Sequence, residues 1–251
     1  RPIFITTVHG PYSVNFYSRI MTKGDRVIVV SKMIMEYVLK NYKIDKQKIV
    51  LNYRGVSKKY FPYNFKATEK WLKIWQKDFP QTKNKIILTL PARITRWKGQ
   101  DDFIILLKKI TEKNPNVHGL IVGEEKNKAR FINKLKSQTT ILGLANNLTF
   151  VGHRSDIREI MSISKIVFSL SREPEAFGRI SLESLSMGIP VIAYSHGGVK
   201  EQMLEILPEG LIVVENIDLV ALLTNKWIKK GPKINKSHIF TLKKMLEKTV
   251  L

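Results

Sequence analysis

Two loops that follow apolar, strand-like segments carry charged residues suited to binding phosphates and sugars. In the first loop, Arg93 and Lys98 stand five residues apart, after the apolar run 85–90 and just before a helix-like segment. Two cations beside the free N–H groups of a helix start predict a diphosphate site. The alternative for this loop is an ordinary basic surface segment.

The second loop follows the apolar run 166–170 and contains Glu175, Gly178 and, inside the next helix-like segment, Glu183. Gly178 lets the backbone approach a ligand closely, and a helix that starts there offers N–H donors to a phosphate. Glu183 lies among apolar residues, so a buried carboxylate there would need partners such as sugar or ribose hydroxyls. The alternative is that both carboxylates are solvated.

Two weaker candidates also stand after strand-like segments. Gly197 and Gly198 follow the run 191–194 and precede a helix. The turn that they form is either an anion-binding site or a plain turn. His9 follows the run 3–8, where a histidine at a cleft can contact a substrate, although a lone histidine is more often structural.

The elements that position these residues alternate between strand-like and helix-like segments. Apolar runs, each followed by a helical pattern, predict parallel βα units, whose ligands bind at the carboxyl ends of the strands. Strands are expected at 3–8, 26–30, 49–52, 85–90, 119–122, 148–151, 166–170, 191–194 and 211–214. Helices are expected at 12–22, 32–41, 68–77, 100–111, 128–143, 155–162, 177–187, 200–207, 218–228 and 239–251.

This alternation predicts an α/β fold with a partial N-terminal Rossmann-like domain and a complete C-terminal one, a doubly wound parallel sheet of six strands. The expected divisions are 1–60 for the first domain, 61–84 for a linker with one helix, and 85–235 for the second domain. Residues 236–251 are expected to form a helix that returns to the first domain. Three parallel strands leave an edge and both faces uncovered, so we expect further chain before Arg1.

Composition excludes several classes of protein. The 251 residues contain no cysteine, which excludes disulfides, thiolate metal sites and a cysteine nucleophile. The net charge of +22 favours anionic partners, either nucleotides, nucleic acid or anionic lipid, or else reflects a genomic bias toward lysine. The chain lacks a basic helix with interleaved aromatics, so a nucleic-acid module is not predicted. No apolar run is long enough to span a membrane and no signal peptide opens the chain, so cytoplasmic residence is expected.

Taken together, the motifs closely resemble those of the retaining glycosyltransferases of the GT-B architecture, family 4. The most specific similarity lies in EAFGRISLE (175–183), which has two glutamates separated by seven residues. Within that family, the sequence is most similar to bacterial enzymes of lipopolysaccharide-core or capsule assembly. The similar segments are TTVHG (6–10), DRVIVVS (25–31), NYRGVSKKYFP (52–62), RITRWKGQ (93–100), FVGHRSDI (150–157), EPEAFGRISLESLSMGIPVIA (173–193) and HGGVKE (196–201).

The resemblance implies roles for the motif residues. Arg93 and Lys98 would neutralise the diphosphate of the donor, Glu175 would contact hydroxyls of the transferred sugar, and Glu183 would hold the ribose. His9 would lie near the reacting sugar carbon. The other expected donor-binding residues are Gly123, Ala176, Phe177, Gly178, Gly197 and Gly198, with Glu201 ordering the last of these turns.

The reaction implied is transfer of a sugar from a nucleoside-diphosphate sugar to a lipid-linked or polysaccharide acceptor, with retention of configuration. No cofactor or metal is expected, because protein cations would stabilise the leaving diphosphate and no Asp-x-Asp motif occurs. Basic residues would allow peripheral contact with the anionic inner face of the cell membrane. The family's further amino-terminal units are missing from this sequence. The alternatives are therefore a nucleotide-sugar-binding fragment or inactive remnant, a GT-B nucleotide-sugar epimerase, or a nucleic-acid binder.

Overall fold

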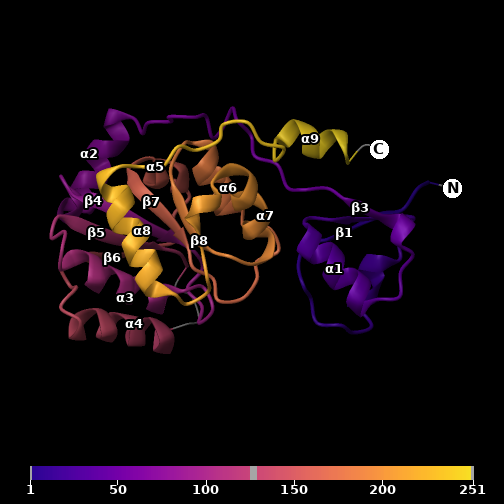
Figure 1. Cartoon of the computed structure of the whole chain (residues 1–251), viewed down its shortest axis with the longest axis horizontal. Helices are drawn as coiled ribbons and strands as arrows, with labels where there is room; N and C mark the ends of the chain where they lie inside the picture. Colours follow the sequence, from indigo (N-terminus) through magenta and orange to yellow (C-terminus); the bar gives the residue numbers. More distant parts are fainter. Residues whose placement is uncertain (1, 125–128, 250–251) are drawn as a thin grey trace.

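The computed structural model describes residues 2–124 and 129–249 and shows two lobes joined by extended chain (Figure 1). The small lobe holds a parallel sheet in the order β1-β2-β3, formed by Ile5–Val8, Arg26–Val29 and Ile49–Leu51. Helix α1 (Lys32–Asn41) packs against this sheet through buried Ile34 and Val38. Ser31 caps α1, because its Oγ accepts a hydrogen bond from Ile34 N at 3.2 Å.

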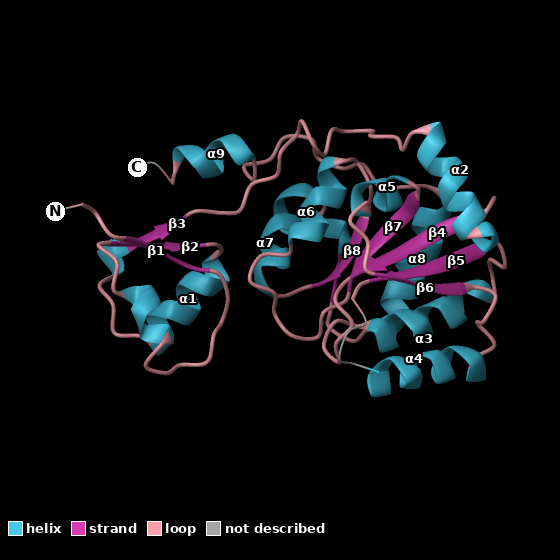
Figure 2. Ribbon diagram, turned by 180° about the vertical axis from the view of Figure 1, so that it is seen from behind, coloured by secondary structure: helices cyan, strands magenta, loops and turns pink. Residues whose placement is uncertain are grey.

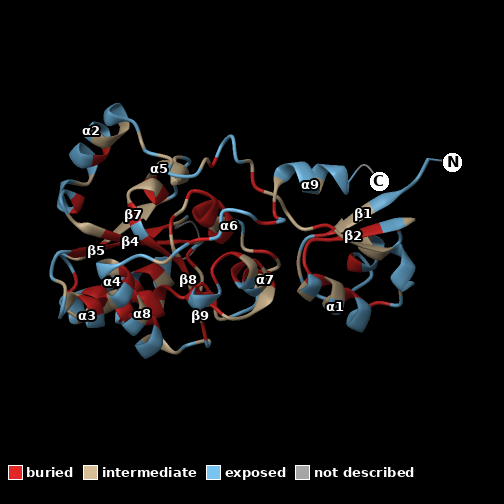
Figure 3. Cartoon of the chain, turned by 45° about the horizontal axis from the view of Figure 1, so that its top comes forward, coloured by how far each residue is buried: buried red, intermediate tan, exposed pale blue. Residues whose placement is uncertain are grey.

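The helix expected over 12–22 is wrong for most of its length, since only Ser18–Thr22 is helical and that turn is a 3₁₀ helix. Asn15 and Ser18 bond each other's backbone through their side chains, with both distances 2.9 Å, which competes with helical hydrogen bonding. Phe16 and Tyr17 are more than 80% exposed, so no apolar face packs to stabilise a helix here. In the small lobe, buried residues lie instead along β2 (Figure 3).

The large lobe contains the six-stranded parallel sheet, as predicted, in the order β6-β5-β4-β7-β8-β9. From β4 the chain builds outward to β6, then returns to the other side of β4 with β7. The boundary between β4 and β7 is therefore a topological switch point, the place where open α/β sheets bind ligands. The strands are β4 (Ile86–Pro91), β5 (Val117–Val122), β6 (Leu148–Gly152), β7 (Ser164–Ser169), β8 (Val191–Tyr194) and β9 (Leu211–Ile212).

Helices cover both faces of this sheet (Figure 2). One face carries α3 (Gln100–Thr111), α4 (Ala129–Ile141) and α8 (Ile217–Lys229), and the other carries α5 (Ile157–Ser162), α6 (Arg179–Ser186) and α7 (Gly197–Ile206). Several helix starts differ from expectation: α5 and α6 each begin two residues later, at Ile157 and at Arg179, and α7 begins three residues earlier, so its glycines lie within the helix. Lys128, in the expected helix 128–143, lies outside the described residues.

The connection between the lobes contains α2 (Glu69–Asp78), which packs Trp75 against the large lobe. The last helix, α9 (Leu242–Glu247), is much shorter than the expected 239–251, because Thr241 is extended and pairs with Val56 as a parallel bridge. Val250 and Leu251 lie outside the described residues. The helix α9 contacts the end of β3, where Asn52 Nδ2 donates to Met245 O at 3.0 Å. Within the described residues, no helix has the length and apolar character needed to cross a membrane.

Candidate functional site

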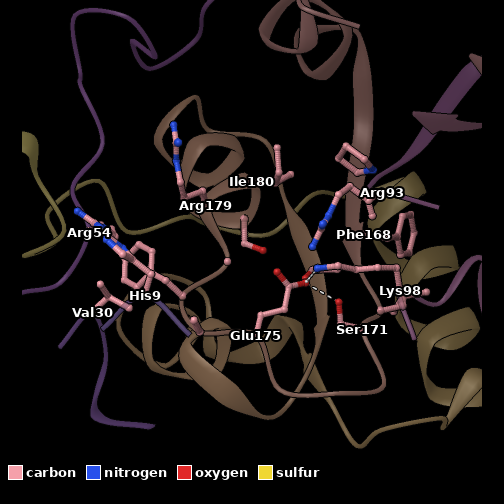
Figure 4. Close-up of a pocket in the computed structure, with 18 of the residues that line it drawn as sticks. His9, Val30, Arg54, Arg93, Lys98, Phe168, Ser171, Glu175, Arg179 and Ile180 are labelled. Atoms are coloured by element: carbon pink, nitrogen blue, oxygen red, sulfur yellow. Dashed lines mark hydrogen bonds and ion pairs between the residues drawn. The ribbon is translucent and has the colours of Figure 1, made fainter. Parts of the chain in front are cut away.

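The loops that follow β4 and β7 meet at the switch point and line a cavity of about 820 Å³. Arg93 and Lys98 come from the β4 loop, and Glu175 comes from the β7 loop. The small lobe closes the other side of the cavity with His9 and Arg54 (Figure 4). Residues from both lobes, more than 160 positions apart in the sequence, therefore face one space.

An ion pair lies at the centre of this cavity. Lys98 Nζ is 2.8 Å from Glu175 Oε1, and Ser171 Oγ donates a hydrogen bond to the same carboxylate oxygen. The Lys98 side chain is only 10% exposed and that of Glu175 22%, so solvent screens this pair weakly. Lys98 Nζ also lies 4.2 Å from the centroid of the Trp97 ring, a cation–π contact that orients the ammonium.

Arg93 stands beside this pair, and its guanidinium points toward Lys98 (Figure 4). Gln100 Nε2 donates to the Arg93 carbonyl oxygen at 3.0 Å, which fixes the loop backbone at the start of α3. In the described parts of the chain, no carboxylate lies within ion-pair distance of Arg93. Two cations and one shared carboxylate leave net positive charge at the strand ends, which suits a diphosphate.

A buried network ties the β4 and β7 loops together behind the cavity. Asp102, in the first turn of α3, is 2% exposed and accepts hydrogen bonds from Tyr194 Oη at 2.7 Å and from Arg172 Nη2 at 2.5 Å. Arg172 N also donates to Trp97 O at 2.7 Å. Asp102 raises the pKa of the Arg172 guanidinium, which stays charged. The network holds Lys98 and Glu175 on loops that are cross-linked through side chains.

Glu183 is buried within α6, as one interpretation of the sequence predicted, but it does not line the cavity. Its carboxylate accepts a hydrogen bond from Arg179 Nη2 at 3.0 Å, one turn earlier in the helix. Burial raises the pKa of Glu183, and the charge of Arg179 opposes that shift without cancelling it. A second acceptor oxygen of Glu183 remains available to a hydroxyl group.

His9 forms the opposite wall together with Arg54. Arg54 Nη2 contacts His9 Nδ1, and because a guanidinium can only donate, Nδ1 is assigned as the acceptor and Nε2 carries the proton. Burial, and then the charge of Arg54, lowers the pKa of His9. His9 is thus a neutral imidazole at pH 7, and its Nε2–H is available to a ligand.

The sequence pattern of the family described as "Glycosyl transferases group 1" matches residues 72–241, about two thirds of the chain. The chain belongs to the group 1 glycosyl transferases. The matched range contains Arg93, Lys98, Glu175 and Glu183, and therefore the whole β4–β7 side of the cavity.

Solved structures share the fold of this group 1 chain. A glycosyltransferase from Rickettsia africae ESF-5 is 30% identical, with a TM-score of 0.83 over 98% of this chain and 68% of that one. The Anabaena HepE protein in complex with UDP and glucose is 22% identical, with a TM-score of 0.75 over 90% of this chain and 62% of that one. The fold is thus α/β and of the GT-B type, as predicted.

Sequence relatives include the lipopolysaccharide core biosynthesis mannosyltransferase LpsB of Rhizobium meliloti, 26% identical over 60% of this chain and 45% of that protein. The chain spans about half the length of the curated relatives that it matches.

The expected glycines of this group 1 site are not all at the cavity. Gly178 lines it, with φ of 84° before α6, and a Cβ there would lie 2.2 Å from Val199 Cγ2. Gly123, Gly197 and Gly198 do not line it. Their positions demand close packing instead, since a Cβ on Gly198 would lie 2.4 Å from Ala176 O. Gly198 N donates to Glu175 O at 2.8 Å, so this turn supports the Glu175 loop from behind.

The expected role of Glu201 in ordering its own turn is wrong. Its carboxylate reaches the small lobe, where it accepts hydrogen bonds from the N–H groups of Lys32 and Met33 and from Tyr53 Oη. This contact forms only when the two lobes pack together, and no local sequence pattern around residue 201 could indicate it.

Sequence reasoning missed two cations in the cavity, Arg54 and Arg179. Arg54 lies within the segment 52–62 that carried the family resemblance, and Arg179 lies within 173–193, so both stood in motifs already identified. The two side chains reach the same cavity only because the two lobes face each other. Among residues 2–124 and 129–249, no cluster of three or more His, Asp or Glu side chains is arranged to hold a metal ion.

Proposed function

We propose that this chain forms the donor-binding part of a retaining glycosyltransferase, which transfers a sugar from a nucleoside-diphosphate sugar to a lipid-linked or polysaccharide acceptor. The observation that carries the proposal is the convergence of Arg93, Lys98 and Glu175 at the β4–β7 switch point. The two cations suit a diphosphate, and the carboxylate suits sugar hydroxyls. Ala176, Phe177 and Gly178 line the same cavity, where their backbone groups would reach the sugar or phosphate.

The chemistry follows from charge. When the glycosidic bond breaks, negative charge grows on the oxygen of the departing diphosphate. Arg93 and Lys98 are held in place before the reaction, so they stabilise this charge without reorganising, and the N-terminus of α6 adds its dipole. In this proposal the two cations do the electrostatic work without a metal ion. The leaving phosphate helps to deprotonate the acceptor on the same face of the sugar, which gives retention.

The remaining roles are proposed from the placement of each residue. The neutral His9 donates from Nε2 to a hydroxyl near the reacting carbon, because it faces Glu175 across the cavity. Glu183 holds the ribose with its second carboxylate oxygen. The nucleotide-sugar assignment is supported by HepE, whose structure holds UDP and glucose.

We further propose a role in lipopolysaccharide or capsule assembly at the cytoplasmic face of the membrane. LpsB, a relative named for lipopolysaccharide core biosynthesis, supports the pathway. The net charge of +22 supports peripheral contact with anionic lipid, where a lipid-linked acceptor resides. An epimerase on the same fold is not favoured, because Glu175 is the sole carboxylate among the described residues that line the cavity.

The proposal is tested by calorimetric titration of a panel of nucleoside diphosphates and their sugars into the 251-residue chain. At least one ligand should bind, and Lys98→Ala should weaken it at least tenfold, roughly the value of one charge-assisted contact. Lys113→Ala, an exposed change far from the cavity, is the matched control. Equal affinity in Lys98→Ala would refute the donor site, and binding without acceptor-dependent release of diphosphate would identify a binding fragment.

A further inference from the structure

A second group of cations lies in the cavity, away from Arg93 and Lys98. Figure 4 shows Arg54 beside His9 at one end and Lys98 with Arg93 at the other, with Glu175 between them. Arg179, at the start of α6, also lines the cavity and lies close enough for its charge to act on Arg54.

Within the described part of the chain, Arg54 has no carboxylate partner. Its contact is with the unprotonated nitrogen of neutral His9, and no carboxylate in residues 2–124 or 129–249 lies within ion-pair distance. Burial and the positive charge of Arg179 lower the pKa of Arg54, although a guanidinium remains protonated at pH 7. A half-buried cation held near a like charge is unfavourable until an anion reaches it.

The available donors fit an oxyanion with several oxygens. A guanidinium has five N–H donors in a planar fork, and Arg54 uses one nitrogen, Nη2, on His9. Arg179 pairs with Glu183 through Nη2, yet its side chain is 77% exposed, so its other donors remain accessible from the cavity. Two such forks that share one space favour a phosphate group, which accepts from both.

We propose that Arg54 and Arg179 form a second anion subsite, which binds a phosphate group carried by the acceptor. This inference rests on the proposed function, which sets the direction in which the donor lies in the cavity. If the donor diphosphate lies at Arg93 and Lys98 and the transferred sugar lies at Glu175, a phosphate at Arg54 is beyond the sugar. It therefore belongs to the acceptor, and a phosphorylated sugar or lipid-linked saccharide is the substrate class that the site selects.

Inorganic phosphate is the probe, measured by thermal unfolding at constant ionic strength with chloride as the reference anion. In the presence of saturating nucleoside diphosphate, phosphate should raise the Tm of the wild-type chain further, because it occupies a separate site. Arg54→Gln should abolish this additional shift while keeping the shift from the diphosphate. Arg26→Gln, an exposed change on β2, is the matched control and should keep both shifts.

Three results would overturn the inference: no additional shift in the wild type, an undiminished shift in Arg54→Gln, or phosphate that merely displaces the diphosphate. The last result would assign Arg54 to the donor. Arg179→Gln, whose side chain is exposed and whose amide can still donate to Glu183, provides a second variant if Arg54→Gln misfolds, and it should also reduce the phosphate shift.

Failure of the proposed function would give a different pattern. If no nucleoside diphosphate binds, phosphate alone still tests the subsite. A phosphate shift that Arg54→Gln removes and Arg93→Gln retains supports a separate Arg54 site even then. A shift that Arg93→Gln removes and Arg54→Gln retains contradicts it.

Discussion

Tyr53 Oη donates a hydrogen bond of 2.8 Å to Glu201 Oε2 across the interface between the two lobes. The same carboxylate accepts the N–H groups of Lys32 and Met33 at the start of α1, both at 2.9 Å. A single side chain of α7 therefore holds the small lobe at its helix terminus and at the end of β3. Because Gly198 of α7 also bonds the Glu175 backbone, this contact connects the relative position of the lobes to the Glu175 loop.

Glu201→Ala should loosen the small lobe without disturbing the large sheet. The substitution leaves two amides and a hydroxyl without their charged acceptor, so we expect a loss of about 1–3 kcal/mol in the free energy of unfolding. Hydrogen exchange at Lys32 and Met33 should accelerate while exchange in β4 and β7 stays slow. Glu36→Gln, an exposed change on α1, is the control, and equal exchange in the two variants would contradict the assigned contact.

Asp102→Asn should weaken both stability and donor binding, although Asp102 does not line the cavity. Loss of the buried charge leaves Arg172 with only the more exposed Glu215, so we expect a cost of about 3 kcal/mol. The loops that carry Lys98 and Glu175 lose a cross-link, and the affinity for nucleoside diphosphate should fall. Urea unfolding and calorimetry measure the two effects. Asp101→Asn, whose partner Lys134 is 67% exposed, should cost about 1 kcal/mol or less.

Most of the fold was predictable because parallel strands buried on both faces are continuous apolar runs. The pattern placed all nine strands that the structure describes, and α1, α3 and β8 have the expected bounds. The site residues Arg93, Lys98 and Glu175 were predictable because strand ends in a parallel sheet gather at one edge. The domain boundaries and the individual site roles remain predictions.

The failures concern one local segment and several contacts between segments far apart in the sequence. The pattern over 12–22 resembled a helix, but Phe16 and Tyr17 are exposed, and hydrogen bonds between Asn15 and Ser18 compete with helical ones. The contacts of Arg54 and Glu201 could not be predicted, because their partners lie in other elements and become neighbours only when the two lobes pack together. Such relationships have no periodic signal along the chain.

Glu175→Gln should separate the two functions assigned to that carboxylate, which are pairing with Lys98 and accepting hydrogen bonds from the sugar hydroxyls. Glu175 neutralises Lys98 in the free protein, so an incoming diphosphate competes with it. The neutral amide removes that competition, and we expect the bare nucleoside diphosphate to bind tighter, by about fivefold for a partly buried pair. The corresponding nucleotide sugar should lose its advantage over the diphosphate, because its hydroxyls lose a charged acceptor. Calorimetric titration of both ligands checks this, and an unchanged ratio of affinities would contradict the sugar contact.

The stability of the chain should fall in acid partly through His118, a fully buried residue of β5 whose Nε2 contacts Thr149 Oγ1 at 2.8 Å. Burial lowers the pKa of His118 to about 4 from the usual 6.5. The unfolded chain therefore binds a proton more readily than the folded one. The stabilisation is fully present above pH 6.5 and is lost as the pH falls toward 4, by at most about 1.4 kcal/mol per pH unit.

Urea unfolding between pH 4.5 and 7.5 measures this dependence. His118→Gln keeps a hydrogen-bonding group at the position but cannot titrate, so its unfolding free energy should vary less steeply with pH than that of the wild type. His153→Gln, a histidine substitution at an exposed position, is the matched control. If His118→Gln keeps the wild-type slope, the acid sensitivity arises elsewhere and the buried imidazole is not its source.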